Sequence, residues 1–303
     1  MSEVRTVLVT GATGLVGGRL VRALLADRVA VRAVSRGSGA RLPHGVAAVQ
    51  WDGVRVPPAA LAGCHAVVHL AGEPVFGGLP NEARRERIRA SRVESTRALV
   101  AALGELPEAA RPRTFVCASA IGYYGSRGEE LLPESAAPGR GFLADVCVAW
   151  EREAAAAAAH GVRVVSLRIG VVLAREGGAL VPIARAFRLG AGGKLGDGQQ
   201  WFPWIHVDDL VAMIRAALGD ERWSGPVNAV GPNPVRNEEF TRVLARAVRR
   251  PAWIPVPGFA LRAVLGDLAD ELLGSRRVVP ERATQLGFRF TVPTLERALE
   301  AEL

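Results

Sequence analysis

Three regularly spaced glycines, Gly11, Gly14 and Gly17, stand near the start of the chain. They follow an apolar run typical of a strand, residues 4–9, and precede apolar residues with helical periodicity. Glycine permits a tight strand-to-helix turn and lets the backbone approach a bound group closely. The first turn of a helix adds unpaired N–H groups and a partial positive charge, which suit a phosphate. The turn therefore predicts a phosphate-binding site; the alternative is a tight turn that binds nothing.

The end of the next predicted strand, residues 29–34, indicates which nucleotide would bind. An acidic residue at roughly 20 positions after the glycine turn would accept a hydrogen bond from the ribose 2′-hydroxyl of NAD. Here Ser35 and Arg36 follow the strand, and no carboxylate is present. A hydroxyl and a guanidinium suit a 2′-phosphate instead. These two residues predict NADP(H) as the cofactor, unless Arg36 is simply one of many surface arginines.

Predicted strands and helices alternate through the first 170 residues, which indicates a parallel sheet with right-handed crossovers. Further strands are expected at 67–70, 114–119 and 162–167, and helices at 80–103 and 143–160. We therefore expect an α/β fold, a Rossmann-type doubly wound parallel sheet over residues 1–170. A smaller, mostly helical C-terminal substrate region is expected over residues 171–303, with late segments contributing back to the sheet.

Several motifs carry a resemblance to a known family. They are TGATGLVG at 10–17, HLAG at 69–72, SAIGYYG at 119–125, LRIGVVLA at 167–174 and WIHVDDL at 204–210. In this combination the chain resembles the extended short-chain dehydrogenase/reductases, in their sugar-nucleotide epimerase branch. FLADVCVAWE at 142–151 and the segment 251–290 are similar to an atypical subgroup of epimerase-like proteins, which has a distinctive C-terminal domain and a generally unassigned substrate.

The resemblance implies cofactor contacts beyond the glycine turn. They include backbone contacts where the strand at 67–70 ends, an arginine on the following helix and a late valine. The matching residues are Gly11, Thr13, Gly14, Leu15, Val16, Ser35, Arg36, Leu70, Ala71, Gly72, Arg92 and Val172. For Arg92 the alternative is again a surface arginine.

The chain lacks the proton-transfer pair that the family uses. That pair is Tyr-x-x-x-Lys on a helix, where the lysine lowers the pKa of the tyrosine so that it acts as acid or base near neutral pH. The only lysine here is Lys194, and the only tyrosines are Tyr123 and Tyr124, so the pair cannot exist. By position, Leu143 takes the place of the tyrosine and Cys147 that of the lysine.

Two replacements for the pair are open. Tyr124 or Tyr123 could donate the proton with help from Ser119, or both tyrosines could pack in the wall of a pocket. Cys147 could be a nucleophile, but no histidine lies near it in sequence. A free cysteine is more often a small buried apolar residue.

An aromatic segment after the glycine-rich stretch 190–198 marks the predicted substrate pocket. It contains Trp201, Trp204 and His206. The two tryptophans line the pocket or fill the core, and His206 is either a pocket residue or a structural one.

Composition places the chain among ordinary globular proteins. Of its 303 residues 49% are hydrophobic and 22% charged, and no apolar run reaches 18 residues, so no membrane partner is expected. Three cysteines without a CxxC spacing argue against disulfides and against a metal site. The net charge of +8 comes from arginines spread along the chain, which does not favour nucleic acid. The first residues do not resemble a signal peptide, so a cytoplasmic location is expected.

These observations lead to two functional hypotheses. The first is an NADP(H)-binding oxidoreductase or epimerase-like enzyme of unknown substrate that uses non-standard proton-transfer groups. The alternative is a non-catalytic protein that senses NADP(H) or binds a partner. The missing Tyr-x-x-x-Lys pair argues against an ordinary sugar-nucleotide epimerase. A small-molecule substrate or none, and a monomer or homodimer, are expected.

Overall fold

A seven-stranded parallel sheet forms the centre of the computed structural model, which describes residues 5–35, 42–51, 55–76, 78 and 81–303. Its order is β11-β7-β5-β4-β1-β2-β3. The strands are β1 (Thr6–Thr10), β2 (Ala30–Ser35), β3 (Val46–Gln50), β4 (Ala66–His69), β5 (Thr114–Ala120), β7 (Arg163–Ile169) and β11 (Gly225–Ala229). The strand order reverses between β1 and β4, so the predicted doubly wound sheet is confirmed. At such a reversal ligands bind outside the carboxyl ends of the strands.

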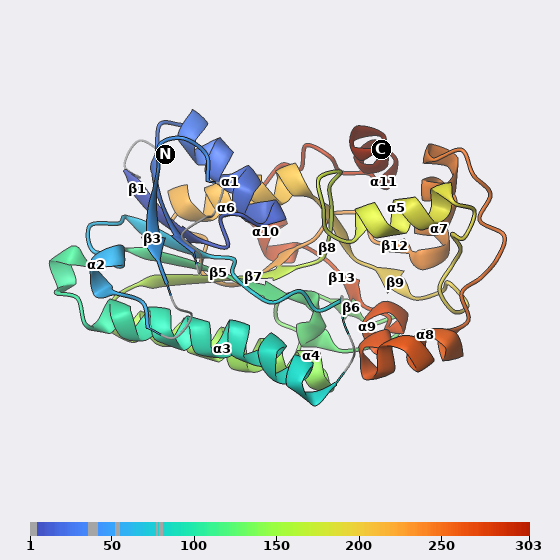
Figure 1. Cartoon of the computed structure of the whole chain (residues 1–303), viewed down its shortest axis with the longest axis horizontal. Helices are drawn as coiled ribbons and strands as arrows, with labels where there is room; N and C mark the ends of the chain where they lie inside the picture. Colours follow the sequence, from blue (N-terminus) through green and yellow to red (C-terminus); the bar gives the residue numbers. More distant parts are fainter. Residues whose placement is uncertain (1–4, 36–41, 52–54, 77, 79–80) are drawn as a thin grey trace.

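Helices cover both faces of the sheet, as Figure 1 shows. One layer consists of α1 (Leu15–Ala26), α6 (Val207–Gly219) and α10 (Glu281–Gln285). The other consists of α2 (Pro58–Leu61), α3 (Glu82–Gly104) and α4 (Phe142–Ala155). Both layers pack on the sheet through large apolar side chains, which make two separate hydrophobic clusters.

Successive residues of the central strands pack against opposite helix layers. In β1, Val7 and Val9 pack in the cluster that contains α1 and α6, and Leu8 packs in the cluster that contains α3 and α4. A strand covered on both faces is apolar at successive positions. This explains why the strand appears in the sequence as one continuous apolar run.

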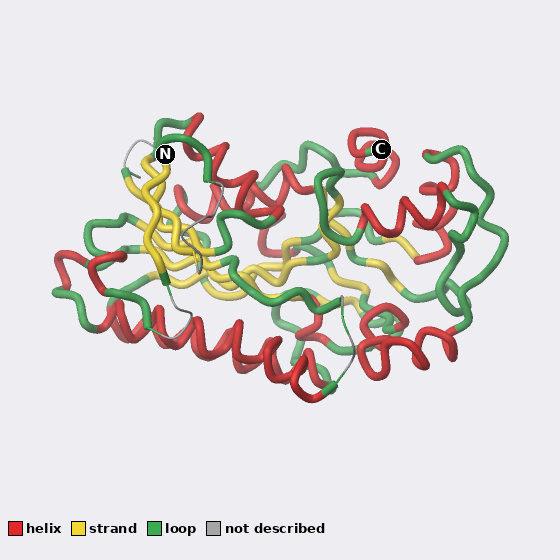
Figure 2. The backbone as a smooth tube through the Cα atoms, in the orientation of Figure 1, coloured by secondary structure: helices red, strands yellow, loops and turns green. Residues whose placement is uncertain are grey.

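The C-terminal region contains short paired strands and small helices beside the sheet (Figure 2). β8 (Val171–Leu173) pairs with β10 (Trp204–His206), β9 (Trp201–Phe202) with β12 (Val235–Arg236), and β13 (Arg277–Val278) with β6 (Leu131–Leu132). The helices are α5 (Leu180–Arg188), α7 (Asn237–Ala247), α8 (Gly258–Leu265), α9 (Ala269–Leu273) and α11 (Leu295–Glu302). Single 3-10 turns are η1 (Glu108–Ala110), η2 (Ile121–Tyr124), η3 (Ala156–His160) and η4 (Gly266–Leu268).

Buried polar contacts hold the segment before α11 against α6. The carboxylate of Asp209 on α6 accepts hydrogen bonds from the backbone N–H groups of Thr291 and Val292 and from the Thr291 hydroxyl. The chain also returns to the sheet after residue 170, because β11 pairs with β7 in parallel. In the described part of the chain no helix has the length and apolar character needed to cross a membrane.

Candidate functional site

A cavity of about 620 Å³ opens at the carboxyl ends of β1, β2 and β4, where the strand order reverses. It brings together seven of the predicted cofactor residues: Gly11, Thr13, Gly14, Ser35, Leu70, Ala71 and Gly72. Arg36 lies outside the described residues. The cavity is the candidate site for a dinucleotide.

The glycine turn at the cavity has no room for side chains. Gly11 has a φ of 68°, in the left-handed region that favours glycine, and a Cβ there would lie 2.9 Å from the backbone of Leu70 and Ala71. A Cβ on Gly17 would collide with the Gly11 carbonyl oxygen. Gly14 precedes α1 without a side-chain cap, so no capping side chain competes with an anion for the first N–H groups of the helix. The turn fits a pyrophosphate.

The wall at residues 70–72 is held by a buried hydrogen-bond relay that begins at Thr10. The Thr10 hydroxyl oxygen accepts from the backbone N–H groups of Leu70, at 3.2 Å, and Ala71, at 3.1 Å. Its one proton is therefore donated to Nδ1 of His69, 2.6 Å away.

The other ring nitrogen of His69 completes the relay. The Ser95 hydroxyl donates to the backbone oxygen of Ser91, at 2.7 Å, and so accepts from Nε2–H of His69, at 3.1 Å. Burial lowers the pKa of His69 to about 3, so the ring is neutral with its proton on Nε2. In the HLAG motif the histidine therefore positions the wall and transfers no proton.

Arg92 supports the wall from behind. Its guanidinium donates to the backbone oxygens of Glu73, at 2.9 Å, and Ile88, at 3.1 Å, and lies over the Trp150 ring. A Cβ on Gly72 would lie 3.4 Å from Cζ of the Arg92 guanidinium. Burial lowers the pKa of Arg92. Arg92 is therefore not an ordinary surface arginine, and it is not among the residues that line the cavity.

Three further predicted contacts are not among the residues that line the cavity. Leu15 and Val16 form the first turn of α1, where they offer backbone N–H groups. Val172 lies on β8, paired with Ile205, and packs against the core.

Sequence reasoning missed the cavity wall that α3 and Trp51 provide. Arg87, Ser91 and Glu94 line the cavity with helical spacing, a polar stripe that the predicted helix 80–103 already carried. Trp51 donates its backbone N–H to the oxygen of Ser35, at 2.9 Å, and lines the same end of the cavity. Its buried indole N–H has no hydrogen-bond partner among the described residues. An unpaired buried donor is costly, and a bound oxygen would satisfy it.

Tyr124 does not fit the predicted role of proton donor. Its side chain is 0% exposed, donates to Oδ1 of Asn228 at 2.6 Å, and accepts from the Arg168 guanidinium at 2.9 Å. Burial raises the pKa of Tyr124 to about 12. A hydroxyl so enclosed joins β11 to β7 and reaches no substrate.

Ser119 and Tyr123 belong to the same buried network. The Ser119 hydroxyl donates to Glu151 at 2.6 Å, and Glu151 makes a bidentate ion pair with Arg168. The Arg168 guanidinium lies 3.4 Å from the centre of the Tyr123 ring. The prediction that Ser119 assists a tyrosine in catalysis is therefore corrected: its hydroxyl is committed to a structural ion pair. Tyr123 provides the aromatic face against which that pair packs.

Two of the three predicted substrate-pocket residues, Trp204 and His206, are buried. Trp204 is 1% exposed and packs in the C-terminal hydrophobic cluster with Leu173 and Phe240. Buried His206 contacts Glu302 on α11 through Nε2, at 2.9 Å, and its Nδ1 accepts from the backbone of Asp208.

Trp201 lies against two arginines. Its ring packs against the guanidinium groups of Arg236 and Arg277, and its N–H donates to Glu129. Trp204 and His206 are therefore enclosed by contacts from distant segments, whereas Trp201 is half-buried and its place in a substrate pocket stays a prediction.

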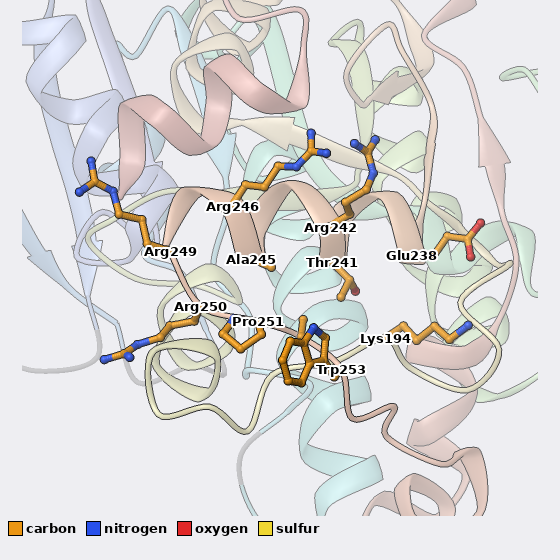
Figure 3. Close-up of a pocket in the computed structure, with 11 residues that line it drawn as sticks. Lys194, Glu238, Thr241, Arg242, Ala245, Arg246, Arg249, Arg250, Pro251 and Trp253 are labelled. Atoms are coloured by element: carbon orange, nitrogen blue, oxygen red, sulfur yellow. The ribbon is translucent and has the colours of Figure 1, made fainter.

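A second cavity, of about 490 Å³, lies on α7 and contains none of the predicted cofactor residues. Lys194, Arg242, Arg246, Arg249 and Arg250 line it, with Glu238 as its one acidic residue. Figure 3 shows Arg242 and Arg246 extending from the same side of the helix, with Trp253 on the opposite side. Within the described ranges, groups of three or more acidic, histidine or cysteine side chains that could hold a metal are absent.

Comparison with known proteins covers both parts of the chain. Residues 7–231 match the model of the NAD dependent epimerase/dehydratase family, and residues 256–302 match a domain of unknown function, DUF1731. The chain is 42% identical over 301 residues to a protein of Arabidopsis thaliana named epimerase family protein SDR39U1 homolog, chloroplastic, covering 98% of this chain and 86% of that protein.

Two solved structures are similar over almost the whole chain. The human epimerase family protein SDR39U1 with NADPH superposes with a TM-score of 0.87 at 33% identity, covering 98% of both chains. A structure named nucleoside-diphosphate sugar epimerase, from Corynebacterium glutamicum, has a TM-score of 0.80 at 35% identity. This match covers 99% of the present chain and 58% of that one.

Proposed function

Because the chain belongs to the NAD dependent epimerase/dehydratase family, we propose that it is an NADP(H)-dependent oxidoreductase that acts on a small carbonyl compound or the corresponding alcohol. The observation that carries the proposal is the glycine cradle at the strand reversal, opening into a cavity of dinucleotide-binding size. The presence of NADPH in the structure of the human relative supports the choice of cofactor.

Different residues at the cavity would bind different parts of the cofactor. The backbone at Gly11, Thr13 and Gly14, with the first turn of α1, would hold the pyrophosphate. Ser35 and Arg36 would hold the 2′-phosphate. The backbone from Leu70 to Gly72, fixed by the relay through His69, would line the path toward the nicotinamide end. When bound, NADPH supplies a hydride.

Selectivity for the substrate is assigned in this proposal to residues 171–303, and binding of the cofactor to residues 1–170. A location in the cytoplasm is part of the same proposal, although the Arabidopsis relative is named chloroplastic. Fractionation of cells that carry the tagged protein tests the location.

A non-catalytic NADP(H)-binding protein remains the second candidate, and one observation favours it. Where the family has its Tyr-x-x-x-Lys pair, this chain has Leu143 and the buried Cys147, whose thiol pKa burial raises to about 12. Neither side chain transfers a proton near neutral pH.

Two assays separate the candidates. Purified protein is titrated with NADPH and NADH, and then NADPH oxidation is followed with a panel of aldehydes, ketones and quinones. Tight NADPH binding with turnover of any member supports the oxidoreductase. Binding without turnover, together with a protein partner that is captured only when NADPH is present, supports the second candidate.

A further inference from the structure

The C-terminal region places a carboxylate beside the position where the family's tyrosine would stand. A Cβ on Gly122 would lie 3.7 Å from Oε2 of Glu271, 3.3 Å from Cβ of Leu143 and 3.8 Å from Sγ of Cys147. Glu271 belongs to α9, which Figure 1 shows beside the layer of α3 and α4. Glu271 and the α4 side chains Leu143 and Cys147, more than 120 residues apart in sequence, therefore lie around Gly122.

That point lies where a ligand is expected to react. Gly122 belongs to η2, which directly follows the carboxyl end of β5. The carboxyl ends of β1, β4 and β5 share one edge of the sheet, and the cofactor cavity opens along that edge. In sheets of this kind ligands extend across this edge.

The surroundings of Glu271 hold its carboxylate in place while leaving it reachable. The side chain is 20% exposed, and its Oε2 pairs with the guanidinium of Arg276 at 2.9 Å. Arg276 is itself 4% exposed, and its Nε has no hydrogen-bond partner among the described residues. Such an inward-facing ion pair contributes little to stability compared with apolar packing, so its presence here calls for another reason.

Other charges act on the same point. Asp270, which precedes Glu271 on α9, raises the pKa of Glu271 by its charge. The charges of Arg92 on α3 and Glu151 on α4 influence the pKa of the Cys147 thiol, which lies near the same glycine. Burial raises the pKa of Glu271 more than Arg276 lowers it, and an upward shift is the direction that a proton-donating carboxyl group needs.

We propose that Glu271 is the catalytic acid and base of this protein, in place of the tyrosine that the chain lacks. This inference rests on the proposed oxidoreductase function. In carbonyl reduction the substrate carbon gains a hydride from NADPH and the substrate oxygen gains the proton of the Glu271 carboxyl group. The carboxylate that remains is stabilised by Arg276 and regains a proton from water. The reverse reaction uses the carboxylate as base.

The first experiment needs no substrate. It measures the dissociation constants of NADP⁺ and NADPH from pH 5 to pH 9. A carboxylate near the nicotinamide favours the positively charged ring of NADP⁺ over the neutral ring of NADPH. The ratio of the two affinities should therefore shift toward NADP⁺ as Glu271 loses its proton, by roughly 5-fold to 900-fold, the range that Coulomb's law gives for two unit charges about 4 Å apart between bulk water and a protein surface. The 2′-phosphate is present in both ligands, so its own titration cancels in the ratio.

The variants identify the group responsible. Glu271→Gln should abolish the pH dependence of the ratio, while Asp270→Asn on the exposed side of the same helix should retain it. A flat ratio in the wild type overturns the inference even if Glu271→Gln fails to fold. A pH dependence that survives in Glu271→Gln, or disappears instead in Glu73→Gln at the cavity wall, also overturns it.

Turnover distinguishes failure of this inference from failure of the proposed function. If the wild type reduces a member of the carbonyl panel, Glu271→Gln should lose at least 100-fold in kcat with NADPH affinity retained, and an unchanged kcat overturns the inference. If the wild type binds NADPH and reduces nothing, the proposed function fails and the catalytic role of Glu271 falls with it. A pH-dependent ratio would then support only its place beside the nicotinamide.

Discussion

The hydroxyl of Thr10 and Nδ1 of His69 lie 2.6 Å apart in the interior, and this contact determines the position of the cavity wall. The Thr10 hydroxyl oxygen accepts from two backbone N–H groups of the wall. His69 fixes the rotamer of Thr10 by accepting the hydroxyl proton. Both residues lie at the carboxyl ends of neighbouring strands, β1 and β4.

Thr10→Val should weaken NADPH binding and reduce the free energy of unfolding by about 1–3 kcal/mol, because it leaves the half-buried N–H of Ala71 and the buried Nδ1 of His69 without their partner. Thr114→Val is the matched control: Thr114 is a buried threonine at the opposite end of the sheet, where its hydroxyl contacts Arg163. The control should lose stability and keep its NADPH affinity. Calorimetric titration and denaturant unfolding measure both quantities, and equal affinities of Thr10→Val and wild type would remove Thr10 from the site.

Neutral His69 should make the protein sensitive to acid. The pKa of His69 in the folded protein is about 3, below its value of about 6.5 in an unfolded chain. The stabilisation is therefore fully present above pH 6.5 and is lost as the pH falls toward 3. His69→Gln should show a shallower loss of unfolding free energy over this window than wild type. Parallel curves for the two proteins would contradict the assignment.

Trp204→Ala should act on the fold and leave NADPH affinity unchanged. Removing a fully buried tryptophan typically costs about 3–5 kcal/mol. Trp253→Ala is the control, because Trp253 is 87% exposed and should contribute little to stability. Thermal unfolding compares the two, and a Trp204→Ala variant of wild-type stability would reopen a role for this residue in ligand binding.

Arg36→Ala should weaken NADPH much more than NADH, since only NADPH carries the 2′-phosphate. A charge-assisted hydrogen bond contributes roughly 1.5–3 kcal/mol, which corresponds to about a 10- to 150-fold loss. Arg246→Ala, in the basic cavity of Figure 3, removes an equal charge away from the cofactor site and should change neither affinity. Equal losses for NADPH and NADH in Arg36→Ala would show that this position does not recognise the phosphate.

Tyr124→Phe should reduce stability by about 1–3 kcal/mol, because it removes the hydroxyl between Asn228 and Arg168. Any turnover by the folded protein should remain within a few-fold of wild type. Loss of a proton donor would instead cost about 10²–10⁴-fold in rate. Tyr123→Phe should change neither quantity, and a rate loss of that size in either variant would restore the tyrosines as catalytic groups.

Local features of the sequence were sufficient to predict five of the seven strands of the sheet, and the glycine turn. A strand buried on both faces is apolar at successive positions, and a turn that passes close to its neighbours requires glycine, so both leave a signal over a few residues. The absence of a Tyr-x-x-x-Lys pair followed from counting one lysine and two tyrosines. β3 and β11 escaped because β3 is a half-exposed edge strand and β11 begins with Gly225 and Pro226, which are poor strand formers.

Only the tertiary structure decided which polar and aromatic side chains are free to do chemistry. Tyr124, Trp204 and His206 have residue types that suit a site, but contacts from Asn228, Phe240 and Glu302 enclose them. Glu271 carries no motif in the sequence, and it reaches Gly122 because α9 packs there across 149 positions of the chain. Burial and ion pairing depend on segments that meet only when the chain folds, so a residue's own neighbours in sequence do not encode its exposure or its pKa.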